Sequence, residues 1–280
     1  MSNAARRALA AEDAPVVMEI LQCVYDKTGI DFREYAFASI RRRVLACMQD
    51  EGLATVAELR DLVCGSDAAM GRILKMLTLP VTSMFRDPQF YAEFRERAVP
   101  LLRTHPYLRL WVAGCSSGQE VYSLAILLHE EGLYERSRIY ATDLQSRALE
   151  QAKRAIFPVA VMQDYTRNYQ AAGGTRAFSD YYTADGHAAL IRPFLQKNVI
   201  FGMHNLATDQ SFNEFQVIFC RNVMIYFSAP LQERVHRLVY ESLAPLGYLG
   251  LGRGETVRFS PHEERYEAVS ARERLYRKIA

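Results

Sequence analysis

The stretch Leu110-Trp-Val-Ala-Gly-Cys-Ser-Ser-Gly-Gln-Glu-Val-Tyr-Ser123 decides the fold of this 280-residue chain. Its first residues, 110–113, form an apolar run typical of a buried strand, and a turn of small residues, 114–118, follows. Apolar residues then recur with the period of a helix that buries one face: Val121, Leu124, Ala125 and Leu128. Strand, turn and helix predict the first unit of an α/β fold, in which the glycines let a ligand approach the backbone closely.

The glycine turn lacks two common phosphate-binding motifs. A dinucleotide fingerprint, G-x-G-x-x-G, needs a middle glycine, whereas this turn has only Gly114 and Gly118. A P-loop needs a lysine after its last glycine, and Gln119 and Glu120 stand there instead. An acid at this position is compatible with a cofactor that carries an amino group and a sulfonium, namely S-adenosylmethionine. The helix dipole alone also favours an acid in a first turn, so both interpretations of Glu120 stay open.

A second acid follows the next predicted strand, Arg138-Ile-Tyr-Ala-Thr-Asp143. In a doubly wound sheet, an acid at the carboxyl end of the second strand accepts hydrogen bonds from both ribose hydroxyls of an adenosine. The alternative is a simple N-cap, because a segment with helical spacing comes next. Ser146 offers a substitute N-cap, which would leave Asp143 available to a cofactor.

Four blocks of the chain resemble the CheR family of chemotaxis methyltransferases, in the family's order and over most of residues 80–255. The most specific is Phe219-Cys-Arg-Asn-Val-Met-Ile-Tyr-Phe227, within the block 217–227 that is followed by 243–249. The other blocks are 81–87, 111–123 with 141–143, and 204–206. The resemblance implies an α/β fold: a Rossmann-like S-adenosylmethionine-dependent methyltransferase domain with a small antiparallel β insertion, preceded by a small all-α domain.

The resemblance also implies an activity, which is transfer of a methyl group from S-adenosylmethionine to glutamate side chains of chemoreceptors (methyl-accepting chemotaxis proteins). The products would be glutamyl methyl esters and S-adenosylhomocysteine, in sensory adaptation. A glutamate carboxylate is ionised at pH 7, so this reaction needs no general base. It needs a group that holds the carboxylate, and the planar fork of an arginine matches one.

The same resemblance implies roles for individual residues. Arg86 and Tyr226 would be catalytic, because each would hold the substrate carboxylate. In the cofactor site, Glu120 would meet the amino group and Asp143 the ribose, with 205–206 at the adenine and 221–222 at the methionine end. The full cofactor-binding set is Thr82, Arg86, Gly114, Glu120, Asp143, Asn205, Leu206, Arg221 and Asn222.

Four of these residues have a purely structural alternative besides those already given for Glu120 and Asp143. Arg86 would pair with Asp87 or with the glutamate at position 93, and Tyr226 would be a core tyrosine. Asn205 would be a turn residue, and Arg221 would form a surface ion pair. Two cysteines inside the motifs, at 115 and 220, are interpreted as packing residues rather than nucleophiles.

Composition and charge agree with this interpretation. The net charge of +2 disfavours a nucleic-acid enzyme. The five cysteines are isolated, and their odd number excludes a complete disulfide framework, so we expect neither a metal site nor an oxidising compartment. No apolar run approaches the length of a membrane span, and the N-terminus lacks a signal sequence. We therefore expect a cytoplasmic monomer whose partners are the cytoplasmic domains of chemoreceptors.

The chain predicts a helical N-terminal domain over 1–78 with frayed residues 1–10, a linker over 79–90 that contributes to the cofactor site, and a methyltransferase domain over 91–280. The domain carries a β insertion over 158–198, where a hairpin joins 181–183 to 188–191. The strands of its parallel sheet are predicted at 108–113, 138–142, 199–203, 216–220 and 247–251.

The chain departs from the family pattern in several places. Met84 replaces a phenylalanine, and the segment 250–255 only approximates the family's usual ending. Pro80, where an asparagine is usual, and Gln119, which replaces the first of two acids, support a second hypothesis. The chain would then be a catalytically weak, S-adenosylmethionine-binding regulatory or interaction module in a receptor-coupled pathway. The run Arg41-Arg42-Arg43 allows either a receptor-binding basic face or a solvated helix, because the three side chains spread around the helix.

Overall fold

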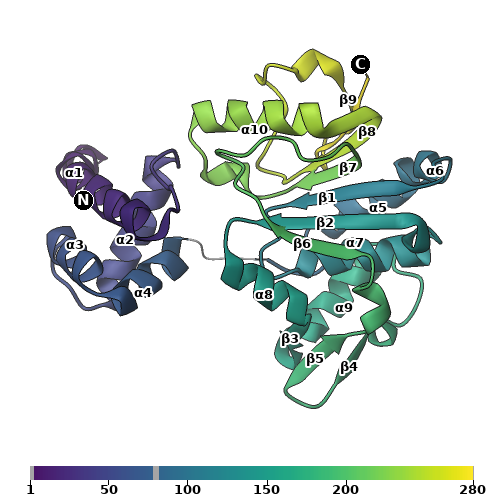
Figure 1. Ribbon diagram of the computed structural model, residues 1–280, viewed down its shortest axis with the longest axis horizontal. Helices are drawn as coiled ribbons and strands as arrows, with labels where there is room; N and C mark the ends of the chain where they lie inside the picture. The colour runs from purple at the N-terminus through teal and green to yellow at the C-terminus, as the bar shows by residue number, and fades with distance from the viewer. Residues whose placement is uncertain (1–2, 78–81, 280) are drawn as a thin grey trace. The chain divides into compact units, whose positions relative to one another are not determined.

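The computed structural model describes residues 3–77 and 82–279, and side chains from residue 13 onward. It divides into two compact units (Figure 1). The first comprises Met1–Pro80 together with Tyr226–Gln232, and the second comprises Val81–Ile225 with Glu233–Ala280. Pro80, one of the departures noted above, lies outside the described residues.

The first unit is built from helices, as predicted. They are α1 (Asn3–Thr28), α2 (Phe37–Asp50), α3 (Val56–Gly65) and α4 (Asp67–Leu77). Helix α1 begins at Asn3, so the expectation of a frayed segment over residues 1–10 is wrong for residues 3–10, while residues 1–2 lie outside the described residues. The apolar stripes of the four helices meet in one core, whose fully buried members include Ile20, Val24, Val44, Leu59 and Ile73. A capping box between Thr55 and Glu58 fixes the start of α3.

A short segment from late in the chain completes this unit. The N–H of Ala36 donates to the carbonyl of Tyr226 at 2.8 Å, and the N–H of Ser228 donates to the carbonyl of Glu34 at 2.9 Å. The ring of Phe227 packs edge-on against Tyr35, with centroids 5.0 Å apart. These contacts give residues 226–232 both backbone pairing and a ring contact within the helical unit.

The three arginines of α2 point in different directions, as predicted from their spacing. Arg41 pairs with Asp13 at 2.6 Å, whereas the guanidinium of Arg43 lies 4.3 Å above the ring of Tyr226. Arg42 is exposed. Two of the three therefore have structural partners, which does not favour a single basic face along α2.

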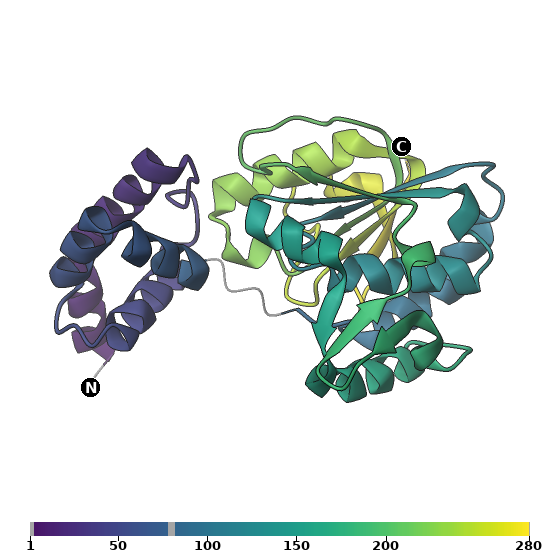
Figure 2. The same cartoon turned by 60° about the horizontal axis from the view of Figure 1, so that its bottom comes forward.

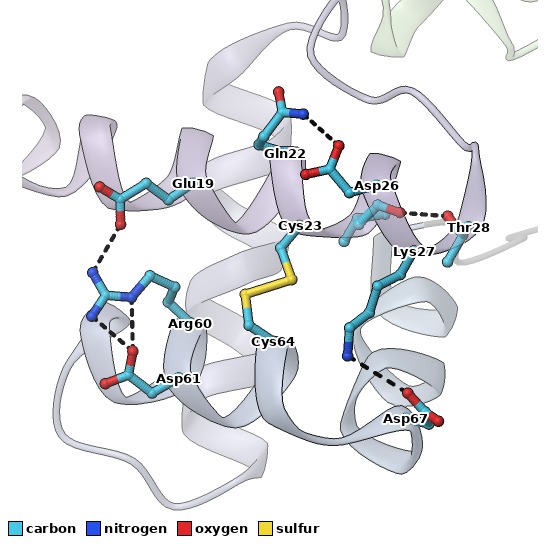
Figure 3. Close-up of a disulfide and its surroundings, with 11 residues drawn as sticks. Glu19, Gln22, Cys23, Asp26, Lys27, Thr28, Arg60, Asp61, Cys64 and Asp67 are labelled. Carbon is cyan, nitrogen blue, oxygen red and sulfur yellow. Dashed lines mark hydrogen bonds and ion pairs between the residues drawn. A yellow bond between two sulfur atoms is a disulfide. The ribbon is translucent and has the colours of Figure 1, made fainter.

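A disulfide joins Cys23 on α1 to Cys64 on α3, with Cα atoms 6.0 Å apart (Figure 3). The expectation of five isolated cysteines is wrong for this pair, because the packing of α1 against α3 brings together positions that lie 41 residues apart in sequence. Closing a loop of this length restricts the unfolded chain and stabilises the fold by about 4 kcal/mol on the chain-entropy model. The remaining cysteines, at 47, 115 and 220, are free and buried.

The second unit is built on a seven-stranded sheet with the order β6-β2-β1-β7-β8-β10-β9. The strands are β1 (Leu108–Ala113), β2 (Ser137–Asp143), β6 (Val199–Met203), β7 (Phe215–Cys220), β8 (Leu243–Leu251), β9 (Tyr266–Ser270) and β10 (Leu275–Lys278). Neighbours from β6 through β8 are parallel, at the five predicted positions. Strand β10 runs antiparallel to β8 and β9, so the sheet is mixed rather than wholly parallel.

Helices cover both faces of this sheet (Figures 1 and 2). One face carries α5 (Pro88–Arg97), α7 (Gln119–Glu130) and α8 (Ser146–Arg154), while the other carries α10 (Ala229–Ser242). The short α6 (Val99–Leu102) follows α5. Aromatic side chains of α5 and apolar residues of α7 pack on the sheet around the fully buried Phe219 of β7. No helix in the described part of the chain is long and apolar enough to cross a membrane.

The predicted β insertion is present as a second, three-stranded antiparallel sheet in the order β3-β5-β4. Its strands are β3 (Ile156–Pro158), β4 (Tyr182–Ala184) and β5 (Ala188–Ile191), and α9 (Met162–Ala171) precedes β4. The hairpin between β4 and β5 turns at Gly186, whose φ is +96°, and Asp185 accepts the N–H groups of the next residues at 187 and 188. Glu130 of α7 anchors the insertion, because its buried carboxylate accepts hydrogen bonds from the hydroxyls of Tyr169 and Tyr181.

One buried histidine makes the stability of the second unit depend on pH. Burial and the nearby His262 lower the pKa of His236 on α10 from 6.5 to about 4. The folded state therefore favours neutral His236, while the unfolded chain takes up a proton below pH 6.5. We predict that this contribution, about 3 kcal/mol, is complete above pH 6.5 and is lost as the pH falls toward 4.

Thermal unfolding of wild type and His236→Gln between pH 4.5 and 7.5 checks this prediction. The variant should lose the steep part of the pH dependence, whereas His187→Gln, at an exposed position, should keep the wild-type curve. Parallel curves for wild type and His236→Gln would assign the acid sensitivity to other groups.

Candidate functional site

The order of the strands marks one edge of the sheet as a binding site. From β1 the chain moves to β2 and then to β6 on one side, and it returns to β7 on the other side of β1. Ligands of doubly wound sheets bind outside the carboxyl ends of the strands at such a reversal. Here the turn 114–118 follows β1, and Arg221 and Asn222 follow β7. The predicted cofactor residues of both segments therefore lie at the switch point.

The turn after β1 needs glycine at both of its ends. Gly114 and Gly118 have φ angles of +73° and +95°. A Cβ on Gly114 would lie 2.6 Å from Cγ2 of Val223, and one on Gly118 would lie 3.0 Å from Cβ of Ala152. Both distances are shorter than a normal carbon contact, so the missing side chains let the turn pack against its neighbours. The backbone at 114 thus touches the turn that follows β7.

Asp143 joins the turns that follow β1 and β2. Its Oδ2 accepts the N–H of Ser116 at 2.8 Å, and its Oδ1 accepts the N–H of Gln145 at 3.0 Å. Burial raises the pKa of this carboxyl, while the backbone hydrogen bonds oppose the rise. The N-cap of α8 is Gln145, and Ser146 is the first residue of the helix. Both parts of the capping alternative, with Asp143 or Ser146 as the cap, are therefore wrong.

Arg221 is a deeply buried charge of the site. Its side chain is 2% exposed, and it donates to Oε1 of Glu120 at 2.7 Å and to Oδ2 of Asp87 at 2.9 Å. The guanidinium lies 4.1 Å from the centroid of Phe90, and the hydroxyl of Tyr91 reaches the same Oε1 of Glu120 at 3.4 Å. The alternative of a surface ion pair for Arg221 is wrong, because this pair is enclosed by α5, α7 and β7.

The segment that carries Arg86 has an unusual backbone. Phe85 and Asp87 both adopt left-handed φ angles, +51° and +56°, which are uncommon for residues with a side chain. The N–H of Phe85 donates to Oγ of Ser123 at 2.8 Å, and the carbonyl of Arg86 accepts from Arg221 at 3.1 Å. These contacts tie the Arg86 backbone to α7 and to the buried ion pair.

The carboxylates proposed as structural partners of Arg86 have other arginine partners. Asp87 binds Arg221, and Glu93 pairs with Arg97 at 2.6 Å within α5. Thr82, half-buried, lies just before the turn at 84–87.

The loop after β6 reaches the same edge of the sheet. The N–H of His204 donates to the carbonyl of Asp143 at 3.3 Å, and Leu206 is 8% exposed. Oδ1 of Asn205 accepts the N–H of Ala207 at 2.9 Å, so this side chain shapes a turn, as in its structural alternative. Tyr226 belongs to the helical unit, where the guanidinium of Arg43 lies 4.3 Å from the centroid of its ring.

Other residues of the motifs are enclosed rather than presented to a ligand. Gln119 is 8% exposed and lies within hydrogen-bonding distance of Ser117 and Tyr165. Burial raises the pKa of the Cys115 and Cys220 thiols well above their usual range, so neither is a nucleophile near neutral pH. Among residues 13–77 and 82–279, no group of three or more histidines, cysteines, aspartates or glutamates is placed to hold a metal ion.

The sequence interpretation missed three contributors to this site. Asp87 precedes Pro88 at the start of α5 and binds Arg221, a role that an acid beside Arg86 does not reveal. Tyr91, fully buried, reaches Glu120 across the interface between α5 and α7. Glu255, from a segment that matched the family's ending only approximately, accepts hydrogen bonds from the turn after β7.

Comparison with known proteins accounts for both units. Residues 80–275 match the family model described as CheR methyltransferase, SAM binding domain, and residues 18–78 match that described as CheR methyltransferase, all-alpha domain. The putative methyltransferase Cher3 of Pseudomonas putida is 45% identical over 259 residues, which cover 92% of this chain and 95% of that protein.

Chemotaxis protein methyltransferases are more distant relatives. One from Listeria monocytogenes is 28% identical over 82% of this chain and 85% of its own length. Chemotaxis protein methyltransferase 1 of Pseudomonas aeruginosa is 28% identical over 90% of this chain and 93% of its own length.

The cofactor is S-adenosylmethionine, and the residues at the switch point fit it. The glycine turn allows close approach, and carboxylates at 120 and 143 suit an amino group and a ribose. Oγ of Ser116 is buried and has no hydrogen-bond partner among the described residues, as expected of a polar atom beside a ligand.

Replacing Gly114 by alanine should therefore weaken cofactor binding. The new Cβ would press on Val223 and would also hold a left-handed φ, so we expect S-adenosylhomocysteine to bind about tenfold more weakly or worse. Gly132→Ala is the matched control, because Gly132 has a φ of +69° but open space around it. It should cost about 1 kcal/mol of stability and leave affinity within about twofold. Titration calorimetry measures the affinity of both variants for S-adenosylhomocysteine. Equal affinities would contradict the inference that Gly114 must lack a side chain for the cofactor to bind.

Proposed function

The chain belongs to the CheR methyltransferase family, and we propose that it methylates glutamate side chains of chemoreceptors in sensory adaptation. The products are glutamyl methyl esters and S-adenosylhomocysteine. The observation that carries this proposal is the strained turn at 85–87, which ties Arg86 to the buried ion pair of the cofactor site. Strain of this kind concentrates at functional sites.

The proposed reaction requires no proton transfer by a side chain of the protein. When bound, S-adenosylmethionine supplies a methyl group on a sulfonium, and its transfer to a carboxylate leaves an ester and S-adenosylhomocysteine. The accepting glutamate is already ionised near pH 7, since its ordinary pKa is about 4.3. The remaining tasks are to hold the carboxylate and to exclude water, because charge is neutralised as the new bond forms.

Arg86 performs the first task in our proposal. Its fork holds the incoming carboxylate, while its backbone is held by Arg221 and by the neighbouring hydrogen bond from Phe85 to Ser123. Tyr226 is the second candidate, with its hydroxyl as a donor to the same carboxylate.

In this proposal, the cofactor-binding residues contact different parts of the cofactor. Within the described residues, Arg221 and Tyr91 both address Oε1 of Glu120, which leaves Oε2 for the amino group of the cofactor. Asp143 takes the ribose, and Asn205 and Leu206 flank the adenine. Asn222 lines the methionine end with Arg221, and Thr82, in the linker over 79–90, contacts the carboxylate of the cofactor.

The partners in this proposal are the cytoplasmic domains of chemoreceptors, and the enzyme acts in the cytoplasm as a monomer. The names of the Listeria and Pseudomonas aeruginosa relatives support this partner class. The competing hypothesis of a regulatory module rests partly on Gln119, which stands where the family has an acid. This side chain is enclosed beside Tyr165, so the presence of glutamine at 119 leaves Glu120 in place.

Labelled methyl transfer tests the proposal. Receptor-containing membranes are incubated with the protein and S-adenosylmethionine labelled in its methyl group, and the product is treated with mild base. A glutamyl methyl ester releases volatile label under these conditions. We expect Arg86→Ala to lower kcat/KM by about 100-fold, because it removes the group that holds the carboxylate, with S-adenosylhomocysteine affinity reduced less.

Arg97→Ala is the matched control for this variant. Arg97 lies on α5 and is 48% exposed, so its removal should leave kcat/KM within about twofold. Label that resists base would mean a different nucleophile. Cofactor binding without any label on receptors would favour the regulatory module.

A further inference from the structure

We propose that Glu255 is a positioning residue of the cofactor site. It acts on the turn after β7 and, through that turn, on Gly114 and Arg221. The inference deepens the proposed function, since it rests on methyl transfer at this site, but its readout is cofactor binding and does not depend on the methyl acceptor.

The carboxylate of Glu255 collects backbone donors from two segments. The side chain belongs to a residue that is 5% exposed, in the loop after β8. Its Oε2 accepts the N–H groups of Asn222 at 2.8 Å and Gly252 at 2.6 Å. Its Oε1 accepts those of Val223 at 2.8 Å, Met224 at 2.8 Å and Ile225 at 3.3 Å.

The turn after β7 requires such an acceptor. Four consecutive N–H groups, 222–225, precede or begin the 3-10 helix Met224–Tyr226, where helix geometry offers them no intrahelical partner. Asn222 has a φ of +59°, which turns these groups toward one point. A carboxylate has two oxygens and about four acceptor sites, whereas a neutral amide has a single oxygen. Burial raises the pKa of Glu255, and the hydrogen bonds from the backbone oppose the rise.

Two contacts carry the position of this turn into the cofactor site. Val223 lies against Gly114, where a Cβ would approach its Cγ2 to 2.6 Å. Arg221 directly precedes the turn and reaches Glu120 at 2.7 Å. A second glycine lies against the same turn, because a Cβ on Gly252 would lie 2.5 Å from Nδ2 of Asn222. The turn is therefore in close contact with two glycines, and a shift of the turn would move both the glycine turn after β1 and the ion pair.

Glu130 provides the matched control for a role in stability alone. It too is a buried carboxylate, 1% exposed in its side chain, with Tyr169, Tyr181 and Arg95 as partners. Its contacts, which also include Thr175, lead to the β insertion and, through Arg95, to the last turn of α5. Among the described residues, none of its partners belongs to the turns after β1, β2 or β7. Loss of either carboxylate should destabilise the fold, because it leaves buried donors without an acceptor.

The experiment compares Glu255→Gln with Glu130→Gln by thermal unfolding and by calorimetric titration with S-adenosylhomocysteine. In Glu255→Gln, the amide NH2 group faces N–H donors, so the turn must move. We expect both variants to lose stability, with affinity reduced about tenfold or more in Glu255→Gln and unchanged within about twofold in Glu130→Gln. Wild-type affinity in Glu255→Gln, or an equal loss in both variants, would overturn the proposal.

Gly252→Ala serves as a second variant should Glu255→Gln fail to fold. It keeps Glu255, but the new methyl group would lie 2.5 Å from Nδ2 of Asn222 and 2.8 Å from Oε2 of Glu255, so it should displace the turn and weaken S-adenosylhomocysteine binding in the same direction. Unchanged affinity in Gly252→Ala would then overturn the proposal. Failure of the proposed function would appear separately, as absence of base-labile label with wild-type protein, and would leave these binding results intact.

Discussion

The buried guanidinium of Arg221 is the interaction on which the cofactor site depends. It joins the end of β7 to the first turn of α7 through Glu120, and to the start of α5 through Asp87. A charge this deeply buried is tolerated only with partners, and Glu120 and Asp87 each provide a carboxylate. The ion pair therefore does more than stabilise, because it fixes the relative positions of three segments that the chain visits far apart in sequence.

Two turns at the same edge of the sheet are each held by a carboxylate that binds their backbone N–H groups. Asp143 holds the backbone of the turn after β1, and Glu255 holds the backbone of the turn after β7. In both cases a carboxylate, partly buried at Asp143 and buried at Glu255, accepts hydrogen bonds from N–H groups that secondary structure leaves unpaired. Such donors are costly to leave without a partner inside a folded protein. Small residues at 114, 118 and 252 then let the turns approach one another, so backbone shape and buried charge define the site together.

Sequence patterns predicted the strands that have apolar runs and failed where the signal lies in tertiary contacts. The strands β1, β2, β7 and β8 were recognised because parallel strands inside a sheet are largely buried and apolar. Strand β6, at the edge of the sheet and partly exposed, was recognised from its apolar residues alone. Strands β9 and β10 were missed because both are short, and because β9, at the edge of the sheet, carries the exposed Glu267 and no fully buried residue. The burial of Arg221 and the pairing of Cys23 with Cys64 depend on helices packing across the chain, which local spacing does not encode.

The helical unit can be completed only after its late segment, Tyr226–Gln232, has been synthesised. Residues 1–77 leave the ribosome early, yet part of the packing of this unit, at Tyr35 and Ala36, waits for residues that follow β7. Its final structure is therefore completed only after most of the methyltransferase unit has been translated. For the same reason, exchange of N-terminal domains between relatives by recombination would separate two parts of one folded body unless residues 226–232 moved with them.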